Sequence, residues 1–556
     1  MMGQGCSLGR PGVLLGLLLL IPAAAPPLRA QAAPTAIEAV WAGPLKAPAV
    51  GEIWLRIRVW ATDKGYAGGY DSPDQQAMDA RLVDTTFQTN VFHCRVMTAG
   101  VSYDGTLSAD GQTLTGTLKT DDGTGYQLTL RRLPGNPKLR RPQEPLEPYP
   151  YGSFRLSFPN PRAGITLAGT LTLPPGTDPF ATILLVAGSG PNKRDEEVYG
   201  HRPLLVLSDL LTRRGFAVLR YDKRGVGESK GDYSQATTAD FADDALAAVE
   251  YLKTRAEVDP KRIGIIGHSE GGLVAPLVAT KTKDVAFILL MAGPSVSGAV
   301  TAAAQVELLL RGEGAPQAQI DRDVAFQKQI ASIVVQELDS AVAATKLRAA
   351  FLAYFASLPE AERAALGDLN ALADSKVQEV LAPWTVNYFR YDPAPTLRQV
   401  ECPLLALFGG HDVQVPPSVN LTPLVQALVD GVTIDGSYQE LPELNHLFQT
   451  SATGLLKEYA RIEETLAPAA TDVILDWVVR QASARGDVNA DGKVNIADVV
   501  LCLRIVAGLH TSVPPDMTRR ADVAPVSPTG VVGDGHVSVA DVVRLLKQVA
   551  GLVVGP

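Results

Sequence analysis

Cysteine is scarce in this chain, which has only four in 556 residues. Cys6 lies near the N-terminus, and the other three, Cys94, Cys402 and Cys502, are far apart in the sequence. Exported domains that depend on disulfides carry many closely spaced cysteines. The pattern therefore excludes a disulfide framework, and Cys402, which precedes an apolar segment, is predicted to be a buried small hydrophobic residue.

The chain also lacks any segment rich in lysine and arginine, and its net charge is -9. Nucleic acids and anionic membrane surfaces are usually bound by such basic segments, so we expect neither as a partner. With 46% hydrophobic and 20% charged residues, the composition is that of a globular protein. A chain of this length is expected to form roughly two to four domains.

Long apolar runs are absent except near the N-terminus. There, Arg10 precedes the run VLLGLLLLI at 13–21, and Ala30-Gln31-Ala32 offers an A-x-A cleavage site. These are the parts of a secretory signal peptide, which we place at residues 1–32. The run is shorter than the ~20 residues of a membrane-spanning helix, so we expect no membrane span in the mature chain. A retained N-terminal anchor is the alternative to a secreted protein, extracellular or associated with the cell surface.

Residues 35–132 have the pattern of an all-β domain. The segment 91–120 is rich in β-branched residues and contains Asp104-Gly105 and Asp110-Gly111, dipeptides that are typical of hairpin turns. We predict a small β-sandwich or barrel. Residues 133–150 hold six prolines and few apolar side chains, which indicates a stiff linker.

Apolar runs alternate with amphipathic helical segments between residues 151 and 480. This alternation predicts an α/β domain with a mostly parallel sheet that is covered by helices on both faces. Residues 296–390, approximately, break the alternation because they have a helical pattern throughout. We expect them to be an insertion that caps the C-terminal edge of the sheet. The predicted strands lie at 181–188, 216–222, 262–269, 286–293 and 403–410.

The stretch GHSEGG at 267–272 ends one of these predicted strands and precedes a helix. A G-x-S-x-G turn between a strand and a helix is the nucleophile elbow of serine hydrolases, where small residues are needed because the turn is tight. Gly267 and Gly271 meet that need around Ser269. The alternative is an ordinary glycine-rich turn with a solvated serine. Ser269 is a nucleophile only if the chain also supplies a base, an acid and an oxyanion hole.

His446 is the histidine best placed to be the base. It lies in a loop after the last apolar strand and fits the chain order Ser…Asp…His. Asp412 follows the strand at 403–410, where it would hold His446 in the required tautomer and stabilise its imidazolium form. A solvated loop carboxylate is the alternative for Asp412. The other six histidines are excluded by position: His93 in the β domain, His201 before the serine, His268 beside the serine, His411 beside the acid, and His510 and His536 in the tail.

An oxyanion hole requires two N–H donors near the nucleophile. One donor is predicted to be the main-chain N–H of Glu270, directly after Ser269. The second is expected from the loop after an earlier strand, and Ser189, in the glycine-rich loop at 187–190, is our choice.

The motifs GSGPNKRDE (188–196), RYDKRGVGES (220–229), GHSEGG, GGHDVQVPP (409–417) and LNHLFQ (444–449) resemble those of the α/β-hydrolase superfamily. The likeness is greatest to bacterial serine esterases of the serine-aminopeptidase or dienelactone-hydrolase-like branches, and it covers roughly residues 150–475. The resemblance implies an α/β-hydrolase fold, an ester substrate and no cofactor for catalysis. The sequence departs from many relatives at 187–190, which read Ala-Gly-Ser-Gly where those relatives have His-Gly.

The tail, residues 485–556, contains an internal repeat. The segments 496–509 and 539–552 are 43 residues apart and match at 9 of 14 positions. Such repetition indicates a duplicated helical unit. Before the first helix, oxygen-bearing residues follow the spacing of a 12-residue calcium loop, with Gly492 at its sharp bend. The predicted calcium ligands are Asp487, Asn489, Asp491, the carbonyl of Lys493, Asn495 and Asp498, with Asp534 and Asp541 in a degenerate second loop.

An aspartate at the last position of this loop, together with the duplicated helix, resembles a type I dockerin. The resemblance implies that the tail binds calcium and docks onto a cohesin module of a scaffold protein or a cell surface. The bland alternative is an acidic surface turn. Enzymes that carry dockerins often accompany the degradation of polysaccharides, which is an association and not a property of this site.

The sequence therefore predicts an exported serine carboxylesterase that forms an acyl-enzyme on a small ester substrate. Apolar residues of the insertion, such as Leu308, Phe351 and Trp384, are candidates to reach the pocket, although helix packing explains them equally well. One alternative is a serine peptidase that acts on short peptides. Another is a non-catalytic protein of the surface that keeps the hydrolase fold.

Overall fold

A computed structural model describes most of the chain. Described are residues 37–47, 51–72, 77–133, 141–177, 179–433, 435–459, 462–482, 488–489, 494–509, 517, 521, 523 and 537–550. The predicted signal peptide, part of the linker, and the predicted calcium ligands Asp487, Asp491, Lys493 and Asp534 lie outside the described residues.

The N-terminal domain is a closed antiparallel barrel, which confirms the all-β prediction. Each strand pairs with the next in the chain, and β1 closes the barrel by pairing with β8. Apolar side chains that include Trp41, Leu55 and Phe92 fill its interior. The strands are β1 (Ala39–Ala47), β2 (Gly51–Thr62), β3 (Gly65–Ser72), β4 (Ala77–Gln88), β5 (Val91–Val96), β6 (Val101–Leu107), β7 (Thr113–Thr120) and β8 (Gly125–Leu133).

One of the two predicted hairpin turns in this domain is wrong. Asp110 and Gly111 do lie in the turn between β6 and β7, where Gly111 has a positive φ of 69°. Asp104 and Gly105, however, lie inside β6. Asp104 is paired there with His93 of β5, whose Nδ1 is 2.7 Å from Asp104 Oδ1. Cross-strand pairing therefore outweighs the local preference of Asp-Gly for a turn.

The central domain contains an eight-stranded sheet in the order β16-β15-β14-β13-β11-β12-β10-β9. β9 and β10 are antiparallel to their neighbours, and all other pairs are parallel, as predicted for most of the sheet. The strands are β9 (Gly152–Asn160), β10 (Ile165–Leu173), β11 (Phe180–Val186), β12 (Ala217–Tyr221), β13 (Val258–His268), β14 (Val285–Met291), β15 (Leu404–Gly409) and β16 (Gly436–Leu441).

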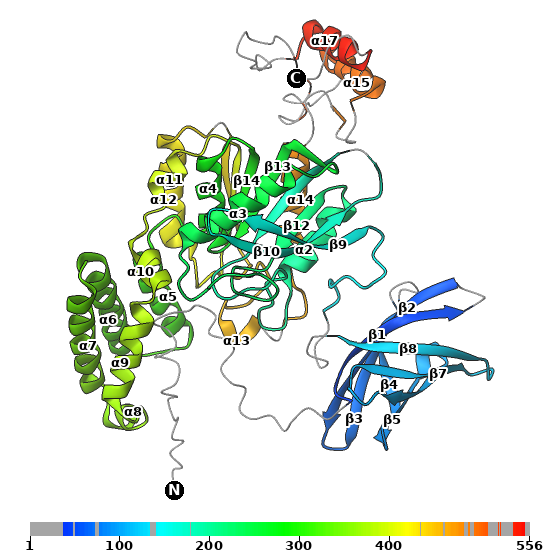
Figure 1. The fold of residues 1–556 in the computed structure, drawn as a ribbon, viewed down its shortest axis with the longest axis horizontal. Helices are drawn as coiled ribbons and strands as arrows, with labels where there is room; N and C mark the ends of the chain where they lie inside the picture. Colours follow the sequence, from blue (N-terminus) through cyan, green and yellow to red (C-terminus); the bar gives the residue numbers. More distant parts are fainter. Residues whose placement is uncertain are drawn as a thin grey trace.

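Helices cover both faces of this sheet (Figure 1). One layer holds α3 (Thr238–Leu252), α4 (Gly271–Lys281), α11 (Ala394–Arg398) and α12 (Pro417–Asp430), and α2 (Pro203–Arg213) and α14 (Pro468–Ala482) pack on the other face. The N-terminus of α3 shows why it begins where it does. Thr237 accepts a hydrogen bond from the main-chain N–H of Asp240, whose carboxylate accepts the N–H of Thr237.

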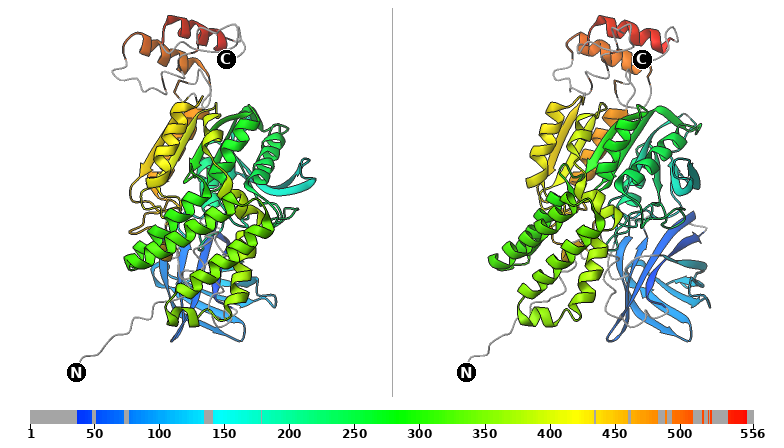
Figure 2. Two further views of the ribbon diagram at one scale, coloured as in Figure 1. Left: turned by 90° about the vertical axis from the view of Figure 1, so that its left-hand side faces the viewer. Right: turned by 60° about the vertical axis from the view of Figure 1, so that its left-hand side comes forward.

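Residues 298–390 form a helical insertion between β14 and β15. Its helices pack around their own apolar core, which includes Ile330, Leu347 and Phe351. The insertion and the barrel both extend from the lower side of the central domain in the view of Figure 1, and Figure 2 shows the same arrangement after rotation. The helices are α5 (Gly298–Gly312), α6 (Gln317–Gln336), α7 (Ser340–Ser357), α8 (Glu360–Ala364), α9 (Leu369–Val380) and α10 (Pro383–Arg390).

Two helices of the C-terminal repeat, α15 (Ile496–Val506) and α17 (Val539–Val549), pack against each other at the opposite end of the central domain (Figures 1 and 2). A small apolar core that includes Val499, Cys502 and Leu545 joins them. Among the described residues, no helix combines the length and the apolar character that a membrane span requires.

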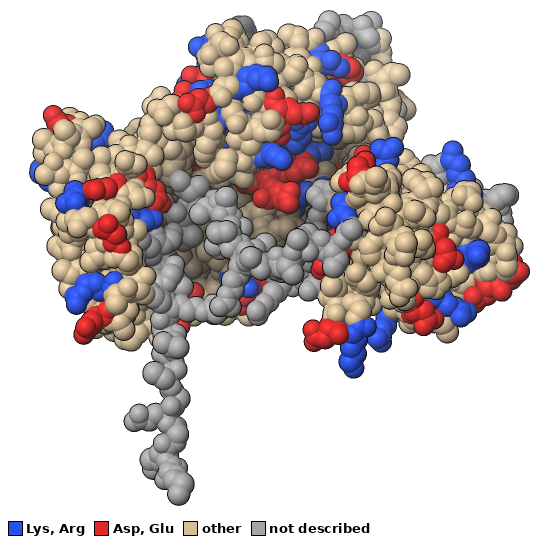
Figure 3. Space-filling model, turned by 60° about the horizontal axis from the view of Figure 1, so that its bottom comes forward, with Lys and Arg blue, Asp and Glu red and all other residues tan. Residues whose placement is uncertain are grey.

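Cys94 and Cys502 are buried free thiols. Cys402 is also a free thiol and is only partly buried, packed against the core of the central domain. On the face of the molecule in Figure 3, acidic and basic side chains are interspersed among uncharged ones. This mixture agrees with the modest net charge of -9.

Candidate active site

The parallel strands bring the loops that follow them to one edge of the sheet. β11, β13 and β14 run side by side in register, with Val186 opposite Gly267 and His268 opposite Met291. β15 and β16 continue the sheet in the same direction. Loops that follow parallel strands meet at the carboxyl edge, which is where ligands bind in open α/β sheets.

Ser269 occupies a strained turn between β13 and α4. Its φ is 53°, a left-handed conformation that is unusual for a residue other than glycine. The flanking glycines are sterically required, since a Cβ on Gly267 would lie 2.0 Å from the carbonyl oxygen of Gly271. A Cβ on Gly271 would lie 2.2 Å from the carbonyl oxygen of Val186. Such strain at a half-buried serine between a strand and a helix is the geometry of a nucleophile elbow.

His446 and Asp412 meet at the same edge of the sheet. Asp412 follows β15 and His446 follows β16, and His446 Nδ1 lies 2.8 Å from Asp412 Oδ2. Asp412 is 2% exposed, and its other oxygen accepts the main-chain N–H groups of Gln414 at 2.7 Å and Val415 at 2.8 Å. The carboxylate is therefore fixed, and it orients the His446 ring so that Nε2 is the nitrogen left for another partner.

Ser269 and His446 line one pocket of about 540 Å³, a volume that includes the part open to solvent. Its walls come from the loop after β11, the elbow, the loops after β15 and β16, and α13 (Leu456–Tyr459). Figure 1 shows α13 on the side of the central domain from which the barrel and the insertion extend. The lining residues are Gly188, Ser189, Asn192, Glu196, Val198, Tyr199, His268, Ser269, Gln414, His446, Leu447, Leu456 and Tyr459.

The three apolar residues of the insertion that were candidates for this pocket have other contacts. Leu308 packs beside a small cluster with Leu309 and Leu310, and Phe351 is fully buried in the core of the insertion. Trp384 donates from Nε1 to the carboxylate of Glu270 at 2.6 Å. None of the three lines the pocket, so the pocket hypothesis for them is wrong. Phe351 packs within the insertion, whereas Leu308 and Trp384 pack against residues of the central domain.

One of the two predicted oxyanion donors, Glu270, directly follows Ser269 in the chain. Glu270 is the residue before α4, and its side chain points into the protein, where Lys223, Thr238 and Trp384 all donate to its carboxylate. Ser189 lines the pocket. Asn192 Nδ2 donates to the carbonyl oxygen of Ser189 at 2.8 Å, which fixes this part of the loop.

The structure also reveals a pair of buried side chains that the sequence analysis missed. Glu196 and His268 both line the pocket, and His268 Nδ1 lies 2.9 Å from Glu196 Oε1. His268 cannot serve as the base, as predicted, because its other nitrogen lies 3.0 Å from the main-chain oxygen of His446. The residues are 72 positions apart, and no motif of the sequence joins them.

His201 is a third buried histidine of this domain, besides His268 and His446. Its Nε2 lies 2.9 Å from the carbonyl oxygen of Tyr459, and its Nδ1 lies 3.1 Å from Thr465 Oγ1. Burial, aided by the charge of Arg141, lowers the pKa of His201 to about 4, against a smaller opposing effect of the hydrogen bond to Tyr459. His201 is therefore neutral at physiological pH.

The C-terminal repeat places two of the predicted calcium ligands at equivalent positions. Asp498 and Asp541 are both buried in the first turn of their helices. The carboxylate of Asp498 accepts main-chain N–H groups of Asn489 and Asn495, and that of Asp541 accepts one from Val523 at 2.8 Å. Within the described residues, no group of three or more His, Cys, Asp or Glu side chains is arranged to hold a metal.

Comparisons with known proteins agree with this architecture. Residues 204–358 match the model of the serine aminopeptidase family S33. Esterase EstD of Thermotoga maritima is 34% identical over 124 residues, which cover 22% of this chain and 30% of EstD. The uncharacterized protein YfhR of Escherichia coli is 35% identical over 98 residues, or 18% of this chain and 31% of YfhR. The matches thus span less than a third of these relatives.

The findings support a hydrolase of the α/β-hydrolase superfamily. Among solved structures, the Pyrococcus furiosus esterase Pf2001 is 19% identical, with a TM-score of 0.32 over 53% of this chain and 82% of that one. Est1E from Butyrivibrio proteoclasticus, solved with ferulic acid, is 15% identical, with a TM-score of 0.34 over 59% and 98% of the two chains.

Proposed function

We propose that this hydrolase is an exported serine carboxylesterase in which Ser269, His446 and Asp412 form the catalytic triad. The observation that carries the proposal is the strained Ser269 at the strand-to-helix turn, in one pocket with a histidine that is bonded to a buried aspartate. Three such groups, each after its own strand and in the chain order Ser…Asp…His, support acyl transfer as the reaction.

In the proposed reaction, Ser269 Oγ attacks the ester carbonyl while His446 Nε2 takes its proton. The negative oxygen that forms is stabilised by the main-chain N–H groups of Ser189 and Glu270. His446 then gives the proton to the leaving alcohol, and the acyl group stays on Ser269. Water, deprotonated by His446, releases the acid and restores the serine. Asp412 stabilises the imidazolium form of His446 in both halves of the cycle. No cofactor takes part.

Hydrolysis of p-nitrophenyl acetate, butyrate and octanoate by the purified protein tests this proposal. We expect activity in the wild type and its loss in Ser269→Ala, because the nucleophile is missing. The order of rates along the chain-length series reports how much acyl chain the pocket accepts. If the Ser269→Ala variant keeps the wild-type rate after spontaneous hydrolysis of the ester is subtracted, the mechanism is contradicted.

The matched family model carries the name of an aminopeptidase, so an aminoacyl p-nitroanilide panel belongs beside the esters. A peptidase for short peptides needs a partner for the charged amino terminus of its substrate. Among the described residues that line the pocket, Glu196 is the one with a carboxylate. It is 4% exposed and already paired with His268, so it is not free to bind a charged amino terminus. This pairing favours the esterase.

The C-terminal repeat is proposed to be a dockerin-like module that binds calcium and docks onto a cohesin module. Each helix exposes three apolar side chains at positions i, i+4 and i+7, and the two sets are related by the 43-residue repeat. Exposed apolar stripes of this kind mark docking surfaces. Their exposed fractions are 59%, 50% and 48% for Ile496, Val500 and Leu503, and 65%, 46% and 48% for Val539, Val543 and Leu546.

The helices α15 and α17 lie at the opposite end of the central domain from α13, which lines the pocket (Figure 1). A partner seated on α15 and α17 therefore leaves the pocket open to substrate. Asp487, Asn489, Asp491, Lys493, Asn495 and Asp498 are the proposed ligands of the first calcium site, with Asp534 and Asp541 in the second. Export by the N-terminal signal peptide would bring the enzyme to the compartment where such scaffolds act.

A further inference from the structure

Glu196 and His268 are two buried ionisable side chains that the proposed reaction does not use. They are 4% and 6% exposed, and they lie next to the nucleophile and the base. Burying ionisable groups is costly unless they are paired. The cost raises the question of what the pair does beside Ser269.

Both ring nitrogens of His268 face hydrogen-bond acceptors. Nδ1 lies 2.9 Å from the carboxylate of Glu196, and Nε2 lies 3.0 Å from the main-chain oxygen of His446. A carbonyl oxygen cannot donate, and a neutral imidazole can donate from only one nitrogen. Two donated bonds therefore require the imidazolium form of His268, with Glu196 as its counter-ion.

The electrostatic environment agrees with this assignment. Burial alone lowers the pKa of His268. The charge and hydrogen bond of Glu196, the hydrogen bond to the carbonyl of His446 and the more distant charge of Asp412 outweigh burial and raise the pKa above its ordinary value. The raised pKa of His268 favours its imidazolium form, in agreement with the two acceptors that face its ring nitrogens.

Glu196 also links the hydrogen bonds of His268 to the loop that carries Ser189. Its Oε1 also accepts the main-chain N–H of Gly188 at 2.6 Å. Asn192 Nδ2 donates to the carbonyl oxygen of Gly188 at 2.9 Å. Gly188, the residue before Ser189, is therefore held through both its N–H and its C=O. With the Gly188 N–H engaged by Glu196, the next N–H along the loop, that of Ser189, is the one left to face an oxyanion.

We propose that Glu196 and His268 are positioning residues that set the distance between the oxyanion loop and the catalytic base. One continuous chain of hydrogen bonds runs from Gly188 through Glu196 and His268 to the backbone of His446, and it passes directly beside Ser269. The proposal rests on the proposed function. Fixing these groups matters because a displacement of ~1 Å at a catalytic group can cost about 10²-fold in rate.

A direct test of the pair needs no substrate. Histidine-selective ¹⁵N labelling of the full chain allows long-range ¹H–¹⁵N spectra of the imidazoles, with His268→Gln to assign the signal of His268. We expect the pKa of His268 to lie above the ordinary value of a histidine, so that the ring keeps both protons at a pH where an exposed histidine has lost one. A neutral His268 that titrates near pH 6.5 overturns the ion pair and with it the proposal.

The functional test compares Glu196→Gln with Glu197→Gln, which removes the exposed neighbouring carboxylate. Glu196→Gln keeps the size of the side chain but removes the counter-ion, so His268 loses its second proton. We expect kcat for p-nitrophenyl butyrate to fall roughly 10- to 100-fold with KM nearly unchanged. Labelling of Ser269 by a fluorophosphonate probe should slow by a similar factor. Glu197→Gln should match the wild type in both assays.

The two readouts separate the possible failures. If the wild type hydrolyses esters and is labelled, and Glu196→Gln behaves like the wild type, the positioning role is wrong while the esterase proposal stands. If the wild type neither hydrolyses esters nor reacts with the probe, the proposed function fails and the positioning role fails with it. If Glu196→Gln does not fold, His268→Gln takes its place in the kinetic test, and the ¹⁵N signal of wild-type His268 decides the ion pair.

Discussion

The pocket region of the central domain and the C-terminal repeat depart from the usual distribution of side chains in opposite directions. Near Ser269, the ionisable residues Glu196, His268 and Glu270 are 4%, 6% and 1% exposed. On α15 and α17, the six apolar residues of the two stripes are between 46% and 65% exposed. Folded proteins more commonly expose charges and bury large apolar groups.

The comparison teaches that each departure has a different physical requirement. A buried charge persists only if partners stabilise it. Glu270 has three donors, and Glu196 Oε1 faces both Gly188 and His268, although its Oε2 has no hydrogen-bond partner among the described residues. An exposed apolar side chain needs no partner in the free protein, but it gains free energy when another surface covers it. Buried charges therefore point to an organised site, and exposed repeated stripes point to association.

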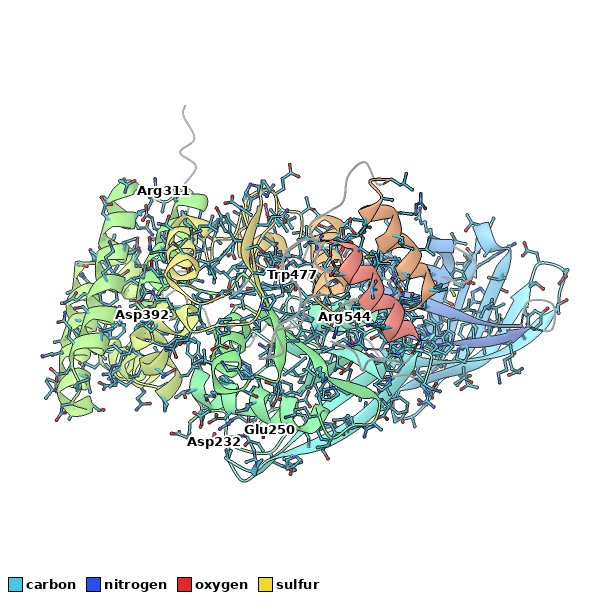
Figure 4. All side chains as sticks on the ribbon, turned by 90° about the horizontal axis from the view of Figure 1, so that it is seen from above. Asp232, Glu250, Arg311, Asp392, Trp477 and Arg544 are labelled. Carbon is cyan, nitrogen blue, oxygen red and sulfur yellow. The ribbon has the colours of Figure 1, made fainter. Side chains whose placement is uncertain are left out.

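The largest effect expected on the pocket side of this comparison follows from Asp412→Asn. An asparagine keeps the shape but favours the wrong tautomer of His446 and cannot stabilise its imidazolium. We expect kcat/KM to fall by about 10⁴-fold, as it does when the aspartate of a triad is so changed. Initial rates with p-nitrophenyl butyrate measure the loss. Asp232→Asn, on an exposed loop residue labelled in Figure 4, is the control and should retain full activity.

The stripes of the C-terminal repeat should matter for binding and not for hydrolysis. Leu503→Asp combined with Leu546→Asp places a charge in each stripe, where a docked partner would have to desolvate it. We expect affinity for a cohesin module to fall by roughly 100-fold or more, about 3 kcal/mol, with ester hydrolysis unchanged. Calorimetric titration against a panel of purified type I cohesins measures the dissociation constant. Comparing the variants reports the contribution of the stripes, and comparing calcium with EDTA reports that of the metal.

The control for the stripes is Val429→Asp. Val429 is 74% exposed on α12, outside the repeat, and should tolerate the charge without any change in binding. EDTA should abolish binding of the wild type because the ligands of the loop lose the ion that orders them. Equal affinity of the wild type and the double variant, in the presence of calcium, rules out the stripes as the docking surface.

His201 and His268, two of the three buried histidines of the central domain, should respond to pH in opposite ways. The pKa of His201 is lowered to about 4, while in the unfolded chain it lies near 6.5. The folded state therefore binds fewer protons in this interval, so stability from His201 is present above about pH 6.5 and is lost as the pH falls towards 4. The loss is at most about 3 kcal/mol.

Urea unfolding of the wild type and of His201→Gln at about pH 7.5 and pH 4.5 measures this contribution. Other groups titrate in the same range, so the quantity of interest is the difference between the two proteins. The wild type should lose more stability on acidification than the variant does. Identical losses would show that His201 is not held neutral in the folded state.

The sequence was sufficient for most of the fold because the strands of the central domain are continuous apolar runs. The predicted runs at 181–188, 262–269 and 403–410 coincide with β11, β13 and β15. Parallel strands place their following loops at one edge, so the residues after each strand, Ser269 and Asp412 among them, are brought together by topology alone. Their proximity was thus predictable without any knowledge of side-chain packing.

The contacts of Glu196 and His268 were not predictable in the same way. His268 bonds to a carboxylate 72 residues away and to a main-chain oxygen 178 residues away, and a main-chain acceptor leaves no trace in residue type. The role expected of Trp384 failed for a related reason. An apolar residue at helical spacing indicates burial, but it does not say against which neighbour, and the indole N–H found the carboxylate of Glu270.

The smallest effect concerns this contact between the insertion and the elbow. Trp384→Phe removes the Nε1–H that donates to Glu270 at 2.6 Å, and leaves Glu270 with Lys223 and Thr238. We expect a loss of stability of about 1–2 kcal/mol. Because the main-chain N–H of Glu270 is a proposed oxyanion donor, kcat should also fall, by less than about tenfold.

The matched control for this change is Trp477→Phe. Trp477, labelled in Figure 4, is 4% exposed and packs edge-on against Phe287, with ring centroids 5.6 Å apart. Both variants lose the same part of an indole ring from the core of the central domain, so both should lower the melting temperature. A fall in kcat confined to Trp384→Phe ties the insertion to the organisation of the elbow through Glu270. Equal kcat in the two variants would show that the hydrogen bond from Trp384 to Glu270 contributes to stability alone. The buried carboxylate of Glu270 would then stabilise the fold without positioning the oxyanion donor.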